Sequence, residues 1–350
     1  MKRLINEENI LSYSELSDEQ RRIYVDAIQT YQALEEARSH AFHYKGYMTW
    51  KKARGREYLF KGRPGARGTG QSLGRRSSAT EKQYEAFYAG KEEATARVEA
   101  LEEQVALKGK YALANRLNRI PRAASQVCRA LNATNCKFVI VGSNALYGYE
   151  VLAGIHFHSE VIATEDLDVL LDTREQLRIS IEGDSPRFIE LLKKADKSFQ
   201  ISDRQKSRAI NNKGYMVDLI TAPKNPPHLV NEFARTLEGD LDIAEIEKLE
   251  WLISAPRVEC YPIAFDGIPV RVTVPDPRAF AVHKYFVSKQ ANREPVKRRR
   301  DESQAKLVID VVNKYLPAFS FSDQALRSFP VQLRQQFLKV NSAGEDERLW

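Results

Sequence analysis

Two apolar segments that carry aspartate residues constrain the fold of this chain more than any other feature. The stretch ATEDLDVLLD places Asp166 and Asp168 two positions apart in what otherwise reads as a short buried strand. Successive side chains on a strand point to opposite faces, so the two carboxylates share one face while Leu167 and Val169 share the other. A third acid, Asp218, lies in a second apolar run, YMVDLI. Because a lone buried charge is costly, these acids predict a sheet that presents carboxylates to a positive partner.

The close spacing of the carboxylates predicts what that partner is. Two adjacent carboxylates repel each other unless a proton or a cation lies between them. A hard divalent ion with oxygen ligands, Mg²⁺ or alternatively Mn²⁺, meets this need and typically brings substrate phosphates with it. Three acids on buried strands could hold two such ions about 3.5–4 Å apart. The alternative is structural: Asp166 would end a loop, and Asp168 and Asp218 would pair with arginine or lysine.

A glycine and a serine stand at the start of a predicted helix upstream of these acids. The segment KFVIVG reads as a buried strand that ends at Gly142, and SNALYGYEVLA reads as a helix that starts at Ser143. A helix N-terminus has free N–H groups and a positive dipole end, which suit an anion. Gly142 would let a phosphate approach the backbone, and Ser143 could cap the helix and bind a phosphate oxygen. Gly-Ser alone is a common cap, but with the three aspartates it indicates a nucleotide- and metal-binding site.

Length and element pattern predict the domain organisation. With 350 residues, the chain is long enough for two domains and a sizeable core. Helical periodicity predicts a helical, basic N-terminal domain over residues 1–125, interrupted by a Gly/Arg-rich segment at 54–76. Short strands and helices mingle over 137–225, which predicts an α+β core. Residues 226–350 read as a hairpin, VECYPIAFDGIPVRVTV, accompanied by helices.

Basic charge is concentrated in the first part of the chain. The formal net charge is +7, of which residues 1–136 carry +8 and the remainder −1. Residues 37–80 hold 11 basic residues, one acid and six aromatic residues. Lys and Arg hold phosphates and aromatic faces stack on bases, so this block predicts a polyanionic partner, RNA or more narrowly tRNA, with Arg63, Arg75 and Arg76 as candidate contacts. The alternative is a disordered or solvated basic loop.

Other features argue against a membrane or secreted protein. No apolar run approaches the roughly 20 residues that span a bilayer. The N-terminal stretch MKRLINEENILSYSELSDEQ has charges where a signal peptide needs its apolar region. Cys128, Cys136 and Cys260 show no close metal-ligand spacing and leave one cysteine over from any disulfide. We therefore expect a reduced, cytoplasmic protein.

The combined pattern resembles a known superfamily. VGSNALYGYE, ATEDLDVLLD and YMVDLI together look like the nucleotidyltransferases of the DNA polymerase β superfamily. The chain is more closely similar to a family of bacterial nucleotidyltransferase-fold proteins. That likeness extends to YLF … GQSLGRRSSATE upstream and to PDPRAFAVHKYFVSK … REPVKRRRDESQA downstream, so it covers most of residues 55–310. The interval from Ser143 to Asp166 is longer than in many members, which implies an inserted turn or strand around GIHFHSEVIAT.

The resemblance implies a fold, a reaction and residue roles. The core would be of the polymerase-β type, a mixed sheet flanked by helices. The three aspartates would bind catalytic metal ions, and Asp218 would help to activate an acceptor hydroxyl. Gly142 and Ser143 would hold the β- and γ-phosphates of a nucleoside triphosphate (NTP). Lys284 would contact a phosphate, the alternative being a solvated helix lysine.

The implied reaction leaves the acceptor open. An acceptor hydroxyl would attack the α-phosphorus of the NTP and release pyrophosphate, with RNA as the expected acceptor. One alternative is a non-catalytic nucleic-acid-binding protein on the same fold, since fold does not determine function. The other alternative is nucleotidyl transfer to a protein or a small molecule, for which the basic block would be incidental.

Overall fold

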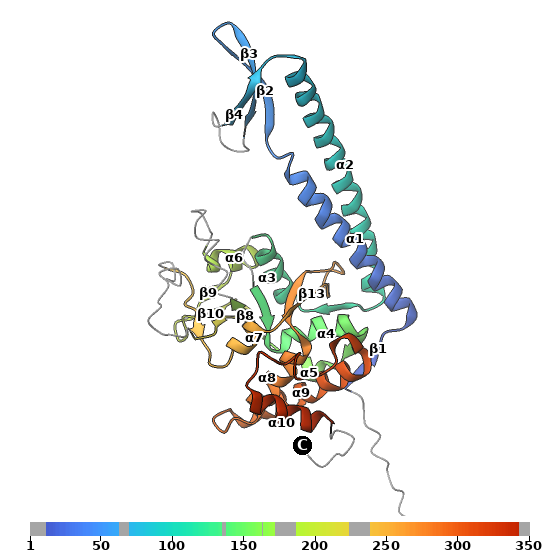
Figure 1. Cartoon of the computed structure of the whole chain (residues 1–350), viewed down its shortest axis with the longest axis vertical. Coiled ribbons are helices and arrows are strands. Elements are labelled where there is room, and N and C mark those ends of the chain that lie inside the picture. The colour runs from blue at the N-terminus through green and yellow to red at the C-terminus, as the bar shows by residue number, and fades with distance from the viewer. Residues whose placement is uncertain are drawn as a thin grey trace, which may run out of the picture. The chain divides into compact units, whose positions relative to one another are not determined.

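The described chain forms two compact units. The computed structural model describes residues 12–62, 70–134, 138–162, 164–171, 187–223 and 239–342, and Figure 1 labels the elements. One unit, here called the N-terminal unit, contains residues 22–117 with 267–269. The other, here called the core unit, contains the rest of the described chain.

The division differs from the expected boundary near residue 125 because of two strand pairs. Strand β1 (Tyr13–Glu15) pairs antiparallel with β7 (Ile155–Phe157). Strand β5 (Asn118–Ile120) pairs parallel with β14 (Ile263–Ala264). Strands β1 and β5 of the expected N-terminal domain therefore belong to the core unit, and periodicity does not detect such short long-range pairs.

The N-terminal unit combines two long helices with a three-stranded antiparallel sheet (Figure 1). Its elements are α1 (Asp18–Phe42), β2 (Tyr47–Ala53), β3 (Arg56–Gly62), β4 (Gly70–Arg75) and α2 (Ser78–Ala114). The segment 54–76, expected only as an interruption, thus supplies two of the strands. Arg54 and Gly55 connect β2 to β3 with φ angles of 49° and 73°, the positive values that a two-residue hairpin turn requires.

A small apolar cluster holds this sheet against α2. Met48, Leu59 and Phe87 are buried in it. The partly buried side chains packed against them are Tyr44, Trp50, Leu73, Tyr84 and Tyr88. Several aromatic residues of the basic block therefore pack inside the unit rather than standing free for bases.

The core unit is built on one mixed sheet. Its strand order is β6-β8-β11-β10-β9, and β12 also pairs with β11. The strands are β6 (Phe138–Val141), β8 (Asp166–Leu171), β9 (Gln200–Ile201), β10 (Arg208–Ile210), β11 (Met216–Thr221) and β12 (Ala244–Glu245). The β8–β11 pair is parallel, whereas β6–β8 and β10–β11 are antiparallel.

Helices and a hairpin surround the sheet. The helices are α3 (Arg122–Asn132), α4 (Leu146–Ala153), α5 (Ser159–Ile162), α6 (Phe188–Ala195), α7 (Glu250–Ser254), α8 (Pro277–Ser288), α9 (Pro295–Tyr315) and α10 (Val331–Ser342). The 3₁₀ turns are η1 (Gly142–Ala145) and η5 (Pro317–Phe319). Strands β13 (Arg257–Cys260) and β15 (Val272–Pro275) form the expected antiparallel hairpin. The predicted α+β fold, with a mixed sheet flanked by helices and a helical C-terminal part, is confirmed.

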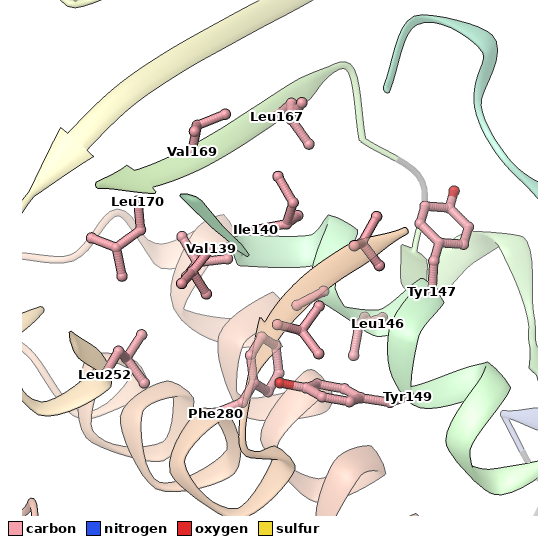
Figure 2. Close-up of a cluster of buried hydrophobic side chains, with 14 of the residues drawn as sticks. Val139, Ile140, Leu146, Tyr147, Tyr149, Leu167, Val169, Leu170, Leu252 and Phe280 are labelled. Carbon is pink, nitrogen blue, oxygen red and sulfur yellow. The ribbon is translucent and has the colours of Figure 1, made fainter. Parts of the chain in front are cut away.

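The core explains why β8 can carry acids. Leu167 and Val169 are completely buried, and Figure 2 shows them on one side of β8 with Leu170 on the other. Alternation then places Asp166 and Asp168 on the same side as Leu170. The two carboxylates are therefore held on a rigid strand that its apolar residues anchor. No described helix has the length and apolar character needed to cross a bilayer.

Candidate active site

The sheet register brings the three predicted aspartates together. In the parallel β8–β11 pair, Asp168 lies directly opposite Asp218. Asp166 lies two residues before Asp168 on β8, so the three carboxylates share one face of the sheet. Strand β6 ends at Val141, which pairs with Asp168 from the other side, and this places Gly142 next to the same carboxylate.

The electrostatics of this carboxylate cluster favour the binding of additional positive charge. Burial, together with the nearby carboxylates of Asp166 and Asp218, raises the pKa of Asp168 to about 6. Lys284 and Arg208 lower the pKa of Asp168 but do not cancel the effect. A carboxyl group whose pKa is raised in this way gains from any added cation nearby.

Asp218 already has a positive partner. The Arg208 guanidinium donates from Nε to Oδ1 at 2.6 Å and from Nη2 to Oδ2 at 2.5 Å. This fork is the structural alternative for Asp218, whereas Asp166 and Asp168 make no ion pair with the described residues. Across the described ranges, no group of three or more His, Cys, Asp or Glu side chains is arranged to hold a metal ion. While Arg208 holds Asp218, two carboxylates remain open to a cation.

Polar contacts fix the beginning of β8. The Thr164 hydroxyl hydrogen-bonds the Asp166 carboxylate. The Asn144 side-chain amide donates to the main-chain carbonyl of Asp166 at 2.6 Å. Asn144 follows the Gly-Ser pair directly, so η1 and β8 are connected through this buried amide.

Gly142 occupies a position that no side chain fits. Its φ angle is +63°, in the left-handed region that disfavours residues with a Cβ. A Cβ at this position would also overlap the Asp168 carboxylate. The glycine therefore permits the close approach of backbone and carboxylate, and a phosphate contact at this turn stays a prediction.

Ser143 differs from the expectation in one respect. The helix begins as the 3₁₀ turn η1 at Gly142, and no side chain caps it. Instead the Ser143 hydroxyl accepts a hydrogen bond of 3.0 Å from Nε2 of Gln304 on α9. The same nitrogen donates to the Val161 carbonyl at 3.1 Å. Because that carbonyl can only accept, both N–H groups of Gln304 are used, and the Ser143 hydroxyl keeps its own proton free to donate.

We expect the fully buried Gln304 to be coupled energetically to Ser143. Gln304→Met keeps the shape but leaves the Val161 carbonyl without its donor, so the free energy of unfolding should fall by about 1–3 kcal/mol. Combined with Ser143→Ala, the loss should be less than additive in a double-mutant cycle measured by urea unfolding. Gln332→Met, the same change at an exposed position on α10, should have little effect. Strict additivity of the first pair would contradict the coupling.

Lys284 is not a solvated helix lysine. Its Nζ lies 2.6 Å from Oδ1 of Asp301, and the side chain is only 13% exposed. Asp301 is 3% exposed and also accepts from Arg293 at 2.9 Å. The positive charge of Lys284 also lowers the pKa of Asp168, so the lysine acts electrostatically on the carboxylate cluster. A phosphate contact from Lys284 stays a prediction.

The predicted nucleic-acid contacts lie in the N-terminal unit. Arg63 is outside the described residues. Arg76 pairs with Glu57 at 2.6 Å and with Glu81 at 2.8 Å. Arg75 has no ion pair with any described residue and is exposed. The structure thus distinguishes two neighbouring arginines that the sequence treats alike.

Comparison with known proteins identifies the family. Residues 122–329, more than half of the chain, match a family described as nucleotidyltransferase. The chain belongs to this nucleotidyltransferase family. The matched range contains every core-unit site residue discussed above, from Gly142 to Gln304.

One solved structure is similar to part of this chain. It is described as an antigenic nucleotidyltransferase-like protein from Paracoccidioides brasiliensis, and it is 16% identical with a TM-score of 0.31. The match covers 64% of this chain and 91% of that chain. No curated protein matches the sequence.

Proposed function

We propose that this chain transfers a nucleoside monophosphate from an NTP to an acceptor hydroxyl in a Mg²⁺-dependent reaction. Membership in the nucleotidyltransferase family supports nucleotidyl transfer in general and an NTP as substrate. The single observation that carries the finer proposal is the register that sets Asp166, Asp168 and Asp218 on one sheet face beside Gly142.

The donor set fits a divalent cation. Carboxylate oxygens are the ligands that Mg²⁺ prefers, and Asp168 gains from added positive charge. Asp166 and Asp168 would hold the ions, with Mn²⁺ as an alternative, and Asp218 could join them only after Arg208 releases it. When bound, the ions would lower the charge cost at the attacking and leaving oxygens.

The chain's own groups would position the triphosphate. The Ser143 hydroxyl, oriented by Gln304, keeps a proton to donate to a phosphate oxygen. Gly142 lets the turn lie against the Asp168 carboxylate, so a phosphate at this turn would lie beside a cation that the carboxylate holds. Lys284 would contribute a positive charge, held in place by the buried Asp301. These groups would hold the α-phosphorus where an acceptor hydroxyl could attack it in line, with pyrophosphate leaving.

We propose RNA, with tRNA as one candidate, as the acceptor. The NTP site needs a few positive groups, whereas residues 37–80 carry a net charge of +10. This surplus suits a second and larger anion that also ends in a hydroxyl. RNA meets both conditions; a protein or small-molecule acceptor would leave the basic block without a role.

The test is an acceptor screen with labelled NTPs. Labelled ATP, CTP, GTP and UTP are incubated with cellular RNA, total protein or small metabolites, with Mg²⁺ and with the Asp168→Ala variant as the blank. Label in RNA supports the proposal. Label in protein or in small molecules would mean that these, and not RNA, are the acceptor. RNA binding without any transfer would favour a non-catalytic protein on this fold.

We also expect Asp166→Asn to match or exceed the wild type in stability without metal. The folded-state pKa of Asp168 is raised above its unfolded value of 3.8, so charge at Asp168 destabilises the fold above about pH 6 and not below about pH 4. Removing the neighbouring charge should therefore raise the free energy of unfolding at pH 8 by up to about 1 kcal/mol, with a smaller gain at low pH. The measurement is thermal unfolding at pH 5 and pH 8. A large loss at pH 8 would mean that Asp166 is a structural ion-pair partner.

A further inference from the structure

A basic hollow lies where the sheet of the N-terminal unit meets the first turn of α2. Its volume is about 550 Å³, within the range of ligand sites, and it is open to solvent. Strands β2, β3 and β4 each contribute one cation to its wall, namely Lys52, Arg56 and Arg75. The three residues lie on three different strands, so the hollow is a product of the strand pairing.

None of the three cations has a partner among the described residues, in contrast to Lys51, Lys61 and Arg76 of the same unit. Lys51 lies 3.7 Å from the centroid of the Phe60 ring, and Lys61 lies 5.3 Å from that of Phe87. Lys52, Arg56 and Arg75 make neither an ion pair nor a ring contact with any residue that the structure describes. Three like charges around one concavity repel each other, and an anion between them relieves that repulsion.

The acids of the hollow do not supply that anion. Glu57 and Glu81 also line it, but both bind Arg76, which in turn lies over the Trp50 ring at 4.9 Å. Arg76 thus belongs to the internal structure of the sheet and helix start. The positive charge of the unpaired cations is left available to an outside ligand.

We infer that this hollow binds the phosphodiester backbone of the RNA acceptor. The inference rests on the proposed function, which requires an acceptor that combines a polyanionic body with a reactive hydroxyl. Tyr47 in the same unit is 37% exposed, and such a ring can stack on a base but offers nothing specific to an acidic peptide. Lys52, Arg56 and Arg75 then contact phosphates, while Arg76 keeps the wall in shape.

The test measures RNA binding in a protein that cannot turn over. On the Asp168→Ala background, the variant Lys52→Ala/Arg56→Ala/Arg75→Ala is compared by fluorescence anisotropy with a charge-matched control, Lys82→Ala/Arg97→Ala/Lys110→Ala. The control residues are exposed on α2 and lie outside the hollow. We expect the hollow variant to bind a labelled RNA oligonucleotide at least about ten-fold more weakly than the control. The slope of log K against log salt should become shallower by about 2, since each lost phosphate contact removes about 0.7 for single strands.

Single variants test the inference without relying on the triple variant. Arg75→Ala should weaken RNA binding without lowering the melting temperature, whereas Arg76→Ala should lower the melting temperature. Equal losses in the hollow and control triple variants, or an unchanged salt slope, would overturn the inference. Binding of polyglutamate that is as tight as RNA binding, and equally sensitive to the triple variant, would assign the hollow to an acidic protein instead.

Further arms separate the ligand sources and the two proposals. DNA of the same sequence and ATP alone are titrated in parallel; loss of ATP binding in the hollow variant would make the hollow a nucleotide site and overturn the inference. If RNA binding depends on the hollow but the acceptor screen shows no transfer, the proposed reaction is refuted and the RNA-binding role of the hollow is supported. If the hollow variant with Asp168 restored transfers nucleotides to RNA as the wild type does, the RNA-binding role of the hollow is refuted and the proposed reaction is supported.

Discussion

Asp168→Ala is expected to abolish nucleotidyl transfer while the protein stays folded. Asp168 lies at the centre of the carboxylate cluster, between Val141 on one neighbouring strand and Asp218 on the other. The activity should fall by at least about 10³-fold, the upper range for losing one electrostatic contact to a transition state. Because the pKa of Asp168 is raised to about 6, removal of its charge should not destabilise the fold at neutral pH.

The measurement combines turnover with metal-dependent stability. Mg²⁺ should raise the melting temperature of the wild type, because a ligand that binds only the folded state stabilises it, and this rise should vanish in Asp168→Ala. Asp203→Ala, which removes a fully exposed acid of the core unit, serves as the control and should leave both readouts unchanged. Full turnover by Asp168→Ala, or by wild type in excess EDTA, would refute the metal-dependent mechanism.

Gly142→Ala is expected to lower kcat/KM by about 100-fold or more. The added Cβ meets the Asp168 carboxylate, so either the backbone turn or the carboxylate must shift, and displacements of about 1 Å in an active site cost about that factor. The left-handed φ of +63° adds roughly 1–2 kcal/mol of backbone strain.

Gly214→Ala separates these two effects. Gly214 has a φ of +82°, but a Cβ there would have no atom within 4 Å. It should therefore lose a comparable amount of stability in thermal unfolding and keep its activity. An equal fall in kcat/KM for both variants would mean that strain alone, rather than the contact with Asp168, accounts for the effect of Gly142→Ala.

Lys284 and Asp218 each have an ion-pair partner within the protein. Lys284 is largely buried and held by Asp301, so its charge is fixed in place rather than mobile in solvent. Asp218 is held by Arg208, so the third carboxylate is balanced by a cation within the protein. Both contacts join residues from different elements, which makes the site a product of packing among α8, α9, β10 and β11.

Local pattern in the sequence was sufficient for the parts of the site that lie on single elements. Alternation along ATEDLDVLLD placed Asp166 and Asp168 on one face, and the burial of Leu167 and Val169 agrees with it. The break after KFVIVG located Gly142 at a strand end, where its backbone angle is now seen to exclude other residues. These features depend on the two-residue period of a strand and on the steric freedom of glycine, and both are local properties.

Contacts between residues that are distant in the chain could not be predicted from the sequence. Gln304 lies 161 residues from the Ser143 hydroxyl that it binds, and no local pattern in the sequence marks it as the partner of that hydroxyl. Arg75 and Arg76 look equivalent in the chain, yet the fold pairs Arg76 with two acids and gives Arg75 no ion pair within the described part of the chain. Periodicity reports which face of an element is buried, whereas register and helix packing decide which side chains meet, and those depend on the whole tertiary structure.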